Sequence, residues 1–521
     1  MRFQSAFIAV TVLAASLVIA DDNLDESKAI EKIELLGGKV TRDERLPGRP
    51  VIGVHFQESK KVNDRYLHLL KPFKSLTALN LSGLPISDDG LKELAVLQNL
   101  SDLRLTGTSV TDRCVNDLGN HKNLVALDLS DTYFTDVGLA AVRNALPNLR
   151  IFEEFTASNK VERLGGKFRR DDTMIGCPVI GIDFDHSNFL IDGDLYLLGA
   201  FKYLTTLRIN YTPITDSGLK KIGELKHLKT LDLRGTAITD AGLKDIHNLT
   251  NLTTLSLNET EVSDVGMREL VGFNHLTWLD LSSTQITDDG VNSISELRNL
   301  TTLNLHECRI TDAGAMELKR LTNLTTLMLS SNTISDDGMK ELAELHKLTT
   351  LMLGKCPITD SGLKEINQLT NLTMLNLWSI RITDAGMKEI GELTKLTELY
   401  INGTPISDAG LKEICELKSL TSLSLDGTQI TDVGLKEFTK LKNLTQLYIN
   451  STQITDIGMK ELGQLTDLTA LWLSDTRITD SGLEEISELK NLRFLNINQT
   501  QVTNAGVEEL QETLPKLRIQ R

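Results

Sequence analysis

Apolar and polar residues alternate along most of this chain in a pattern that repeats every 24 residues. In the unit 228–251, Leu228, Leu231 and Leu233 form an LxxLxL pattern. This alternation predicts a short strand that turns its leucines to one face and its polar residues to the other. A single strand cannot bury that apolar face, so neighbouring copies of the unit must cover it.

A second pattern follows each predicted strand. Thr239 and Asp240 provide a helix N-cap and a negative charge in the first turn, and Leu243 and Ile246 follow at helical spacing. We therefore expect the chain to return through a short helix or helical turn. Stacked copies predict an α/β solenoid with a parallel concave β-sheet and short convex helices.

An acidic residue marks the repeat along the sequence. It recurs without insertion at Asp192, Asp216, Asp240, Asp264, Asp288, Asp312, Asp336, Asp360, Asp384, Asp408, Asp432, Asp456 and Asp480, and Asn504 closes the series. A separate short array carries it at Asp64, Asp88, Asp112 and Asp136. These positions predict about four units in the first array and about fourteen in the second.

The LxxLxLxxTxITDxGLxxL pattern resembles the leucine-rich-repeat family of the ribonuclease-inhibitor-like type. It is nearest to the cysteine-containing repeats of F-box adaptors, and the resemblance covers nearly all of residues 50–521. The resemblance implies a horseshoe-shaped solenoid. The family's ladder position is here mostly Thr, such as Thr236, with Asn332, Cys308 and Cys356 as variants. We expect these groups to hydrogen-bond the turn backbone of a neighbouring coil.

Two stretches outside the 24-residue register are duplicates of each other. The sequence LGGK at 36–39, followed by PVIGVHF at 50–56, matches LGGK at 164–167, followed by PVIGIDF at 178–184. Each copy predicts a helix, a glycine turn and a strand that cap the open end of a stack. We expect a capping helix with a short repeat module at 21–155, and a second capping segment with a long repeat array at 156–521.

The first twenty residues are typical of a signal peptide, cleaved after about Ala20. Arg2 precedes an apolar run that ends before Asp21; an uncleaved anchor is the alternative. No other segment approaches the roughly 20 apolar residues of a membrane span. We therefore expect a soluble mature protein, secreted or held in the periplasm or cell envelope. Similar openings precede leucine-rich repeats in some exported bacterial proteins, which favours a bacterial origin.

Charge and motif content exclude several classes of function. The formal net charge of −16 disfavours nucleic acid and anionic lipid as partners. The sequence offers no catalytic constellation, no cofactor motif and no metal-ligand spacing, so we do not expect an enzyme. Asp183, Asp185, Asp192 and Asp194 form an acidic group without EF-hand spacing, interpreted as a solvated edge. Asn-Leu-Thr triplets recur as part of the repeat and are weak indicators of glycosylation.

The solvent-facing strand positions lie ten, eight and six residues before each repeat Asp, and they vary widely while the outer helices repeat GLKEL. All three tryptophans fall on them, which favours a binding face over residues 278–496. Aromatic packing across exposed strands is the alternative explanation. Arg208, Asp232, Arg234 and Asp280 are expected as further polar contacts. The candidate partner-binding residues are Trp278, His306, Met328, Met352, Met374, Trp378, Glu398, Tyr400, Tyr448, Trp472 and Phe494.

These features predict a non-catalytic interaction scaffold that holds a protein, peptide or glycan on its concave face outside the cytoplasm. One alternative is a structural spacer or envelope component without a specific ligand. Another is a substrate-recognition adaptor, as in F-box proteins. That role requires an F-box helix bundle, for which residues 24–50 are too short, and a cytosolic location, which the signal peptide opposes.

Overall fold

The computed structural model describes residues 24–56, 59, 61–129, 132–134, 136–147, 149–151, 153–171 and 179–521. It divides into two compact units, Met1–Arg163 and Leu164–Arg521. The module boundary predicted between residues 155 and 156 falls inside helix α6 (Glu153–Arg163). The predicted signal peptide and Cys177 lie outside the described residues.

The first unit contains one six-stranded sheet in the order β1 to β6. Strands β1 and β2 are antiparallel, and each later strand adds in parallel. The elements besides α6 are α2 (Glu26–Leu35), β1 (Lys39–Arg42), β2 (Val51–His55), η1 (Asp64–Leu70), β3 (Ala78–Asn80), α3 (Asp88–Lys92), η2 (Glu93–Val96), β4 (Asp102–Arg104), η3 (Asp112–Cys114), α4 (Val115–Gly119), β5 (Ala126–Asp128), α5 (Asp136–Ala145) and β6 (Arg150–Ile151), where η denotes a 3₁₀ helix. The capping helix predicted before the first LGGK sequence is therefore present as α2.

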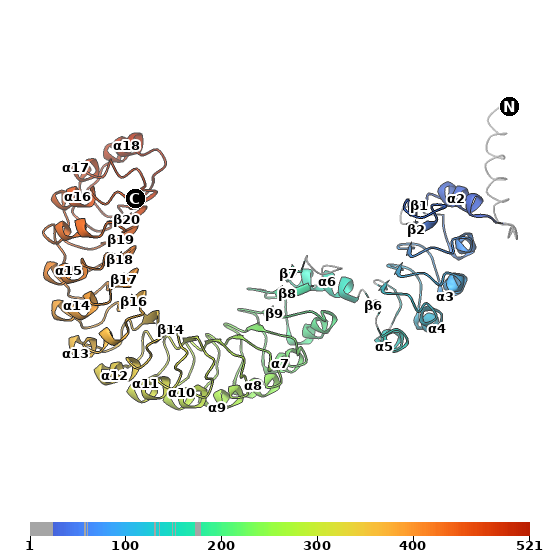
Figure 1. Ribbon diagram of the computed structural model, residues 1–521, viewed down its shortest axis with the longest axis horizontal. Coiled ribbons are helices and arrows are strands. Elements are labelled where there is room, and N and C mark those ends of the chain that lie inside the picture. The colour runs from blue at the N-terminus through green and yellow to red at the C-terminus, as the bar shows by residue number, and fades with distance from the viewer. Residues whose placement is uncertain are drawn as a thin grey trace. The chain divides into compact units, whose positions relative to one another are not determined.

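The second unit is built on a sixteen-stranded sheet, from β7 to β22 in chain order. Figure 1 shows its strands lining the inner side of an arc and its helices the outer side. The strands are β7 (Lys167–Arg170), β8 (Val179–Asp183), β9 (Thr206–Arg208), β10 (Thr230–Asp232), β11 (Thr254–Ser256), β12 (Trp278–Asp280), β13 (Thr302–Asn304), β14 (Thr326–Met328), β15 (Thr350–Met352), β16 (Met374–Asn376), β17 (Glu398–Tyr400), β18 (Ser422–Ser424), β19 (Gln446–Tyr448), β20 (Ala470–Trp472), β21 (Phe494–Asn496) and β22 (Arg518–Gln520).

Short helical segments connect these strands on the outer side. They are η4 (Asp192–Ala200), α7 (Asp216–Ile222), α8 (Asp240–Ile246), α9 (Asp264–Met267), η5 (Arg268–Leu270), α10 (Asp288–Ile294), α11 (Asp312–Leu318), α12 (Asp336–Leu342), α13 (Asp360–Leu363), η6 (Ile366–Gln368), α14 (Asp384–Gly391), α15 (Asp408–Ile414), η7 (Gly434–Lys440), α16 (Asp456–Leu462), α17 (Asp480–Glu484) and α18 (Asn504–Thr513). The predicted α/β solenoid of 24-residue coils is confirmed.

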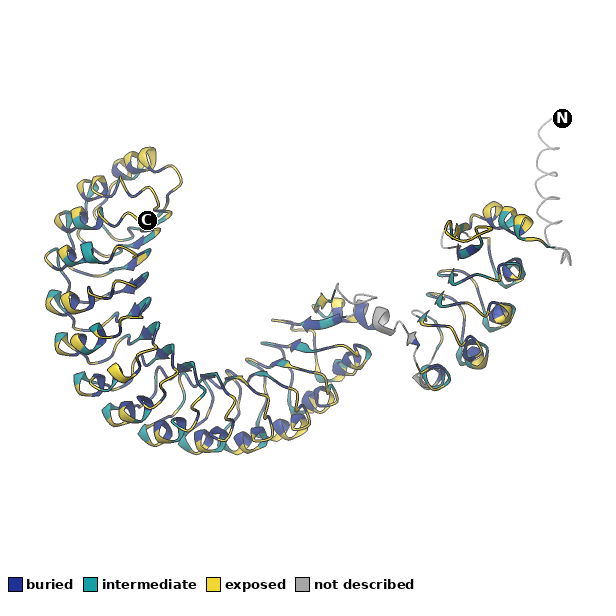
Figure 2. Cartoon of the chain, viewed as in Figure 1, coloured by how far each residue is buried: buried dark blue, intermediate teal, exposed yellow. Residues whose placement is uncertain are grey.

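From β9 onward the sheet register follows the repeat, whereas β7 pairs antiparallel with β8, with an irregularity between Arg169 and Arg170. Leu231 on β10 pairs with Leu255 on β11, and each following strand up to β21 places its central leucine beside the previous one. Leu228, Leu231 and Leu233 are completely buried, as are their counterparts in the later coils up to Leu473. Figure 2 shows this buried band between the strands and the helices. The leucines therefore form one continuous core along the unit.

The repeat Asp joins each coil to the next. Asp216 Oδ1 accepts the backbone N–H of Thr239 at 2.8 Å, and Oδ2 accepts its hydroxyl at 2.7 Å. The same pair of bonds recurs in every coil from Asp192 to Asp480. A Cβ on Gly242 would lie 2.3 Å from Asp216 Oδ1. The Thr-Asp-x-Gly sequence is thus an inter-coil ladder in which the glycine leaves room for the carboxylate.

The predicted N-caps are confirmed in the same place. The Thr239 side chain accepts a hydrogen bond from the N–H of Ala241 at 3.2 Å, in the first turn of α8. The Thr239 hydroxyl therefore caps its own helix and, at the same time, donates to the Asp216 carboxylate of the preceding coil.

The recurrent Asn-Leu-Thr triplet has a packing role. Asn251 donates from Nδ2 to the carbonyl of Lys226 at 2.9 Å, and Thr253 donates to the carbonyl of Lys229 at 3.1 Å. Equivalent asparagine and threonine bonds follow at Asn323 and Thr325. Both polar side chains of the triplet thus satisfy backbone groups of the preceding coil, which explains its recurrence.

The prediction that threonines at the family's ladder position, such as Thr236, hydrogen-bond a neighbouring coil is wrong. The Thr236 hydroxyl donates to the carbonyl of Leu233 in its own coil at 2.6 Å, and this local bond uses its single hydrogen. Asn332 has the longer amide and donates from Nδ2 to Leu305 in the preceding coil at 2.7 Å. Cys356 reaches Leu329 with its thiol at 3.3 Å. Only the rarer variants therefore link neighbouring coils.

Four cysteines within the described residues are free thiols, at positions 114, 308, 356 and 415. Burial raises the pKa of Cys356 to about 11 and that of Cys415 to about 12. These thiols stay protonated at neutral pH, as expected of structural cysteines. In the same part of the chain no helix combines the length and the apolar character needed to cross a bilayer.

Candidate binding surface on the concave sheet

The structure places all eleven predicted contact residues on strands of the second unit or two residues after a strand. His306 follows β13 and Trp378 follows β16, while the other nine lie within strands. Each side chain is partly exposed. Because the strands line the inner side of the arc, these residues face its concave side (Figure 1).

Three of the predicted aromatic residues form one cluster near the C-terminal end of the sheet. Tyr448 and Trp472 occupy the same register position on β19 and β20. Their rings stack with centroids 3.9 Å apart and planes inclined by 14°. Phe494 on β21 lies on the other side of Trp472, at 5.2 Å. Trp472 is therefore held between two neighbouring rings.

Trp378 lies apart from this cluster and rests on the preceding coil. A Cβ on Gly354 would lie 2.0 Å from the indole, so only glycine leaves room for the ring at this position. The ammonium group of Lys355 lies 4.5 Å from the ring centroid, a cation–π contact. The indole is thus fixed against the sheet.

Tyr400 stands between Trp378 and the aromatic cluster. Its hydroxyl donates to Glu398 at 2.9 Å. The next strand, β18, carries only buried serines beside its central leucine, so small side chains separate Tyr400 from Tyr448. Partial burial raises the pKa of Tyr400 and of Asp426, the latter bound by Asn450. The five strands β16–β20 therefore do not carry one continuous aromatic surface.

A trough of about 550 Å³ lies in the concave face across the coils that precede Trp378. Four predicted contact residues line it, together with the predicted polar residues Arg234 and Asp280. The complete lining is Arg234, Asn258, Glu259, Asp280, Ser282, Ser283, Asn304, His306, Glu307, Met328, Ser330, Met352, Asn376 and Trp378. One end is acidic and polar, and the other is formed by methionines and tryptophan.

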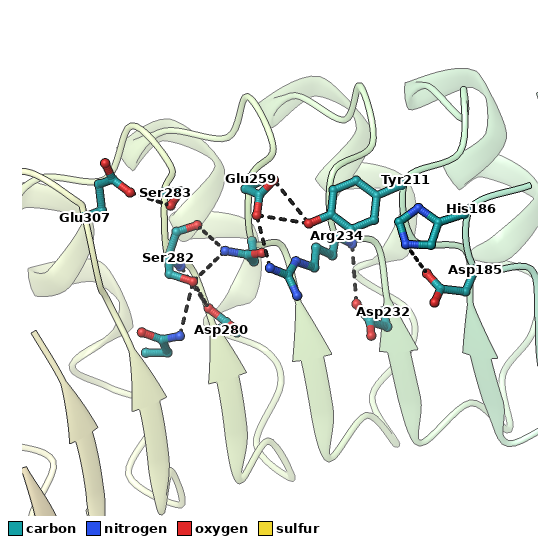
Figure 3. A network of polar contacts seen from close by, with 12 residues as sticks. Asp185, His186, Tyr211, Asp232, Arg234, Glu259, Asp280, Ser282, Ser283 and Glu307 are labelled. Carbon is teal, nitrogen blue, oxygen red and sulfur yellow. Dashed lines mark hydrogen bonds and ion pairs between the residues drawn. The ribbon is translucent and has the colours of Figure 1, made fainter. Parts of the chain in front are cut away.

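A polar network lies at the acidic end of the trough, as Figure 3 shows. Arg234 donates to Glu259 at 3.1 Å, and the Tyr211 hydroxyl donates to the same carboxylate at 3.1 Å. The Arg234 guanidinium lies 5.4 Å from the Tyr211 ring centroid. The His186 ring stacks on the same Tyr211 ring, with centroids 4.8 Å apart. Partial burial and the Glu259 contact raise the pKa of Tyr211. The network holds Glu259 at the rim.

Serines fix the carboxylates further along the trough. Ser282 donates to Asp280 Oδ1 through its hydroxyl at 2.5 Å and its backbone N–H at 2.9 Å. Ser283 donates to Glu307 at 3.2 Å. The acidic groups are therefore oriented by neighbours rather than neutralised by them.

Sequence reasoning missed one whole row of this surface. Five residues before each repeat Asp, the backbone adopts a left-handed conformation and turns the side chain towards the rim. Glu259, Ser283 and Glu307 occupy this row, while Gly235 and Gly403 take the same conformation in other coils. The recurrence of glycine at this position was the available signal.

The acidic group near the start of the second unit has structural roles. Asp192 accepts both ladder bonds from Thr215, and Asp183 pairs with Arg208 at 3.9 Å. Among the residues that the structure describes, no group of three or more His, Cys, Asp or Glu is arranged to hold a metal ion.

Comparisons with known proteins agree with this architecture. A family model described as a leucine-rich repeat region matches residues 189–328 and 379–521, together more than half of the chain. A second model, described as a leucine-rich repeat, matches residues 74–95, 320–343 and 344–366. No curated protein sequence matches the chain.

Several solved structures are similar to it. An internalin from Listeria monocytogenes has 24% sequence identity and a TM-score of 0.43, covering 70% of this chain and 93% of its own. A leucine-rich-repeat protein from Leptospira interrogans has 23% identity and a TM-score of 0.42, covering 86% and 96%. A plant peptide hormone receptor in complex with RGF2 has 18% identity and a TM-score of 0.33, covering 87% and 86%. From the family match and the observed coils, the chain belongs to the leucine-rich-repeat proteins.

Proposed function

We propose that the second unit binds a protein or peptide partner across its concave sheet. The observation that carries this proposal is the concentration of partly exposed Trp, Tyr and Met on the inner strands. From α7 onward, the exposed large apolar residues of the outer segments are single aliphatic or methionine side chains, such as Val265, Met316 and Ile457. Exposed aromatic residues outside the inner strands are grouped at the start of the unit, around η4: Phe189, Tyr196 and Tyr203. Aromatic residues are the strongest contributors to protein interfaces, and an acidic surface gains no solubility from them.

A peptide or protein fits these rings better than a glycan. Stacking of a sugar requires an open ring face, whereas Trp472 has Tyr448 on one side and Phe494 on the other. Trp378 covers Gly354 and is approached by Lys355. The ring edges and the methionines remain available, which favours apolar side chains as the bound groups.

The partner is met outside the cytoplasm in this proposal. The apolar run at the N-terminus and the small residues before Asp21 favour cleavage after Ala20 and export to the periplasm, cell envelope or medium. The duplicated Gly-Gly openings favour a bacterial protein, and the repeat pattern favours the ribonuclease-inhibitor-like type.

The protein acts without catalysis in this proposal, as a scaffold. Neither a nucleophile with its base nor a metal cluster accompanies the trough in the described part of the chain. Nothing specific to this chain favours the adaptor role of F-box proteins, and a spacer would give no reason for aromatics on the inner strands.

Triple replacement of Trp378, Tyr400 and Trp472 by Ser tests the proposal. All three are partly exposed, so the circular-dichroism spectrum should stay unchanged while capture of envelope proteins by the full chain falls at least tenfold. Capture is measured by affinity isolation from the native cell envelope and quantitative mass spectrometry.

A matched control removes three apolar side chains from the outer helices: Val265→Ser, Val433→Ser and Ile457→Ser. These residues are 57%, 65% and 77% exposed. The control should retain capture. Equal capture by the concave variant and the wild type would refute the concave assignment and favour the spacer role.

A further inference from the structure

We propose that the trough binds an extended peptide segment that is cationic at one end and apolar at the other. This inference rests on the proposed function and specifies its partner. A Lys or Arg side chain of the peptide lies between Glu259, Asp280 and Glu307, and an apolar side chain packs on Met328, Met352 and Trp378.

The charge of the trough favours a cationic group at its acidic end. Its lining contains three carboxylates and one guanidinium, and that guanidinium, on Arg234, is already paired with Glu259. Serine donors hold Asp280 and Glu307 without neutralising them. Asp280 and Glu307 form no ion pair in the described structure, although the charge of Asp280 also acts on Arg234. A cationic group entering here gains attraction from both carboxylates.

A buried hydrogen-bond acceptor without a partner also lies at the trough. Asn258 is 6% exposed and lines the trough. Its Nδ2 donates to Ser282, to the carbonyl at 3.0 Å and the hydroxyl at 2.6 Å. Its Oδ1 is buried and has no hydrogen-bond partner among the described residues. A missing partner at a buried acceptor costs about 1–3 kcal/mol. Because protein atoms cover this oxygen, a donor from the ligand relieves that penalty once the amide or its cover moves aside on binding.

The apolar end fixes the direction and length of the segment. Met328 and Met352 pair on adjacent strands β14 and β15, and Trp378 follows β16. From β11, which precedes Asn258, to β16 there are five strand steps, or about 24 Å at the usual spacing. An extended peptide covers this length with about seven residues.

Charge also selects against other occupants. A second copy of this chain would bring a net charge of −16 towards an acidic trough, and anionic glycans or nucleic acids are repelled in the same way. A small amine would leave the methionine end empty. The peptide segment is the occupant that uses both ends.

Selection of random heptapeptides displayed on phage, with the full chain as target, tests this specificity. We expect enriched peptides to carry Lys or Arg at one end and Leu, Met, Phe or Trp four to six residues away. Enrichment of acidic or uncharged peptides would overturn the proposal, as would a purified chain that buries the trough by dimerising.

Variants then locate the selected peptide, with affinity measured by fluorescence anisotropy. Glu259→Gln, Asp280→Asn and Glu307→Gln together should weaken binding 10- to 100-fold and flatten its salt dependence. Asp289→Asn, Glu413→Gln and Glu484→Gln make the same charge change on the outer helices and should alter affinity less than twofold. Unchanged affinity in the first variant would overturn the proposal.

Asn258→Ala separates recognition from a structural role. It removes the unsatisfied oxygen together with the two Nδ2 hydrogen bonds to Ser282, so the melting temperature should fall slightly, whereas peptide affinity should fall three- to tenfold. A lower melting temperature with unchanged affinity would show that Asn258 only supports the fold. Peptide binding lost in the carboxylate variant but kept in the Trp378, Tyr400 and Trp472 variant would contradict the aromatic surface of the proposed function and the Trp378 contact of the peptide, while its cationic end would stand. Binding lost in the aromatic variant but kept in the carboxylate variant would contradict this inference and leave the proposed function standing.

Discussion

Strands β11–β14 and strands β19–β21 carry the same core but different concave surfaces. Leu279 pairs with Leu303 in the first stretch as Leu471 pairs with Leu495 in the second, and all four are completely buried. On the concave side the first stretch presents mainly Asn, Ser and carboxylates, with Trp278 and Met328 as separate apolar side chains, whereas the second presents a stack of aromatic rings. Stacking therefore constrains the buried positions of each coil and leaves the few outward positions free to change with the partner.

If the scaffold is the same beneath both stretches, removing the carboxylate of a repeat Asp should lower the free energy of unfolding by the same amount in each. Asp264 and Asp456 each accept the N–H and hydroxyl of the threonine in the next coil at 2.6–2.8 Å. We expect Asp264→Ala and Asp456→Ala each to lower the free energy of unfolding by about 2 kcal/mol, since a backbone donor loses its partner. Urea unfolding followed by circular dichroism measures both.

Exposed neighbours provide the control for these two variants. Asp289→Ala and Ile457→Ala should cost less than about 0.5 kcal/mol, because both side chains are exposed. A difference above about 1 kcal/mol between the two ladder variants, beyond the usual scatter of independent sites, would show that the two stretches do not share one scaffold.

The first unit contains an exception to the uniform core that sharpens the comparison. His121 occupies the position that Leu97 fills one coil earlier, and it is 2% exposed with Nδ1 3.3 Å from the Leu97 carbonyl. Burial lowers the pKa of His121 below its usual 6.5. His121→Leu should restore the common core and raise the free energy of unfolding by about 1 kcal/mol at neutral pH.

The pH dependence of this effect has a defined sign. The folded state favours neutral His121, so its contribution is complete above pH 6.5 and is lost as pH falls towards the lower folded pKa. Thermal unfolding from pH 7.5 to 5 should therefore show a smaller loss of stability for His121→Leu than for the wild type. Parallel curves would disprove the buried neutral histidine.

The smallest expected effect concerns the single guanidinium of the trough. The Arg234–Glu259 pair is about half exposed, so Arg234→Gln should change stability by less than about 1 kcal/mol. It should strengthen binding of a cationic peptide two- to fivefold, because Glu259 is released. Arg320→Gln is the control, since Arg320 pairs with Glu296 on the outer side and is similarly exposed. Weaker binding in Arg234→Gln would mean that this guanidinium contacts the peptide.

Much of the fold could be predicted because each structural step repeats along the sequence. The leucine spacing predicted the strands, and the Thr-Asp pairs predicted the helix starts. The bonds at the family's ladder position could not be assigned, since Thr236, Asn332 and Cys356 occupy the same position, and only the structure shows that the threonine bonds within its coil while the other two reach the preceding one.

The candidate surface was predicted less completely. Alternation along the strands located the aromatic and methionine positions, but it says nothing of the left-handed residue after each strand. Glu259 and Glu307 reach the trough from that row, which lies outside the strand pattern. Ring contacts also depend on side-chain rotation, so the stacking of Tyr448 on Trp472 and the separation of Tyr400 required coordinates.

Hydroxyl-radical footprinting of the full chain with its bound partner tests the concave surface most directly. Oxidation rates of Met328, Met352 and Trp378 should fall at least fivefold on binding, while Met316, 48% exposed on the outer helix α11, should be oxidised at an unchanged rate. Protection of Met316 with no change at the three concave residues would contradict the account.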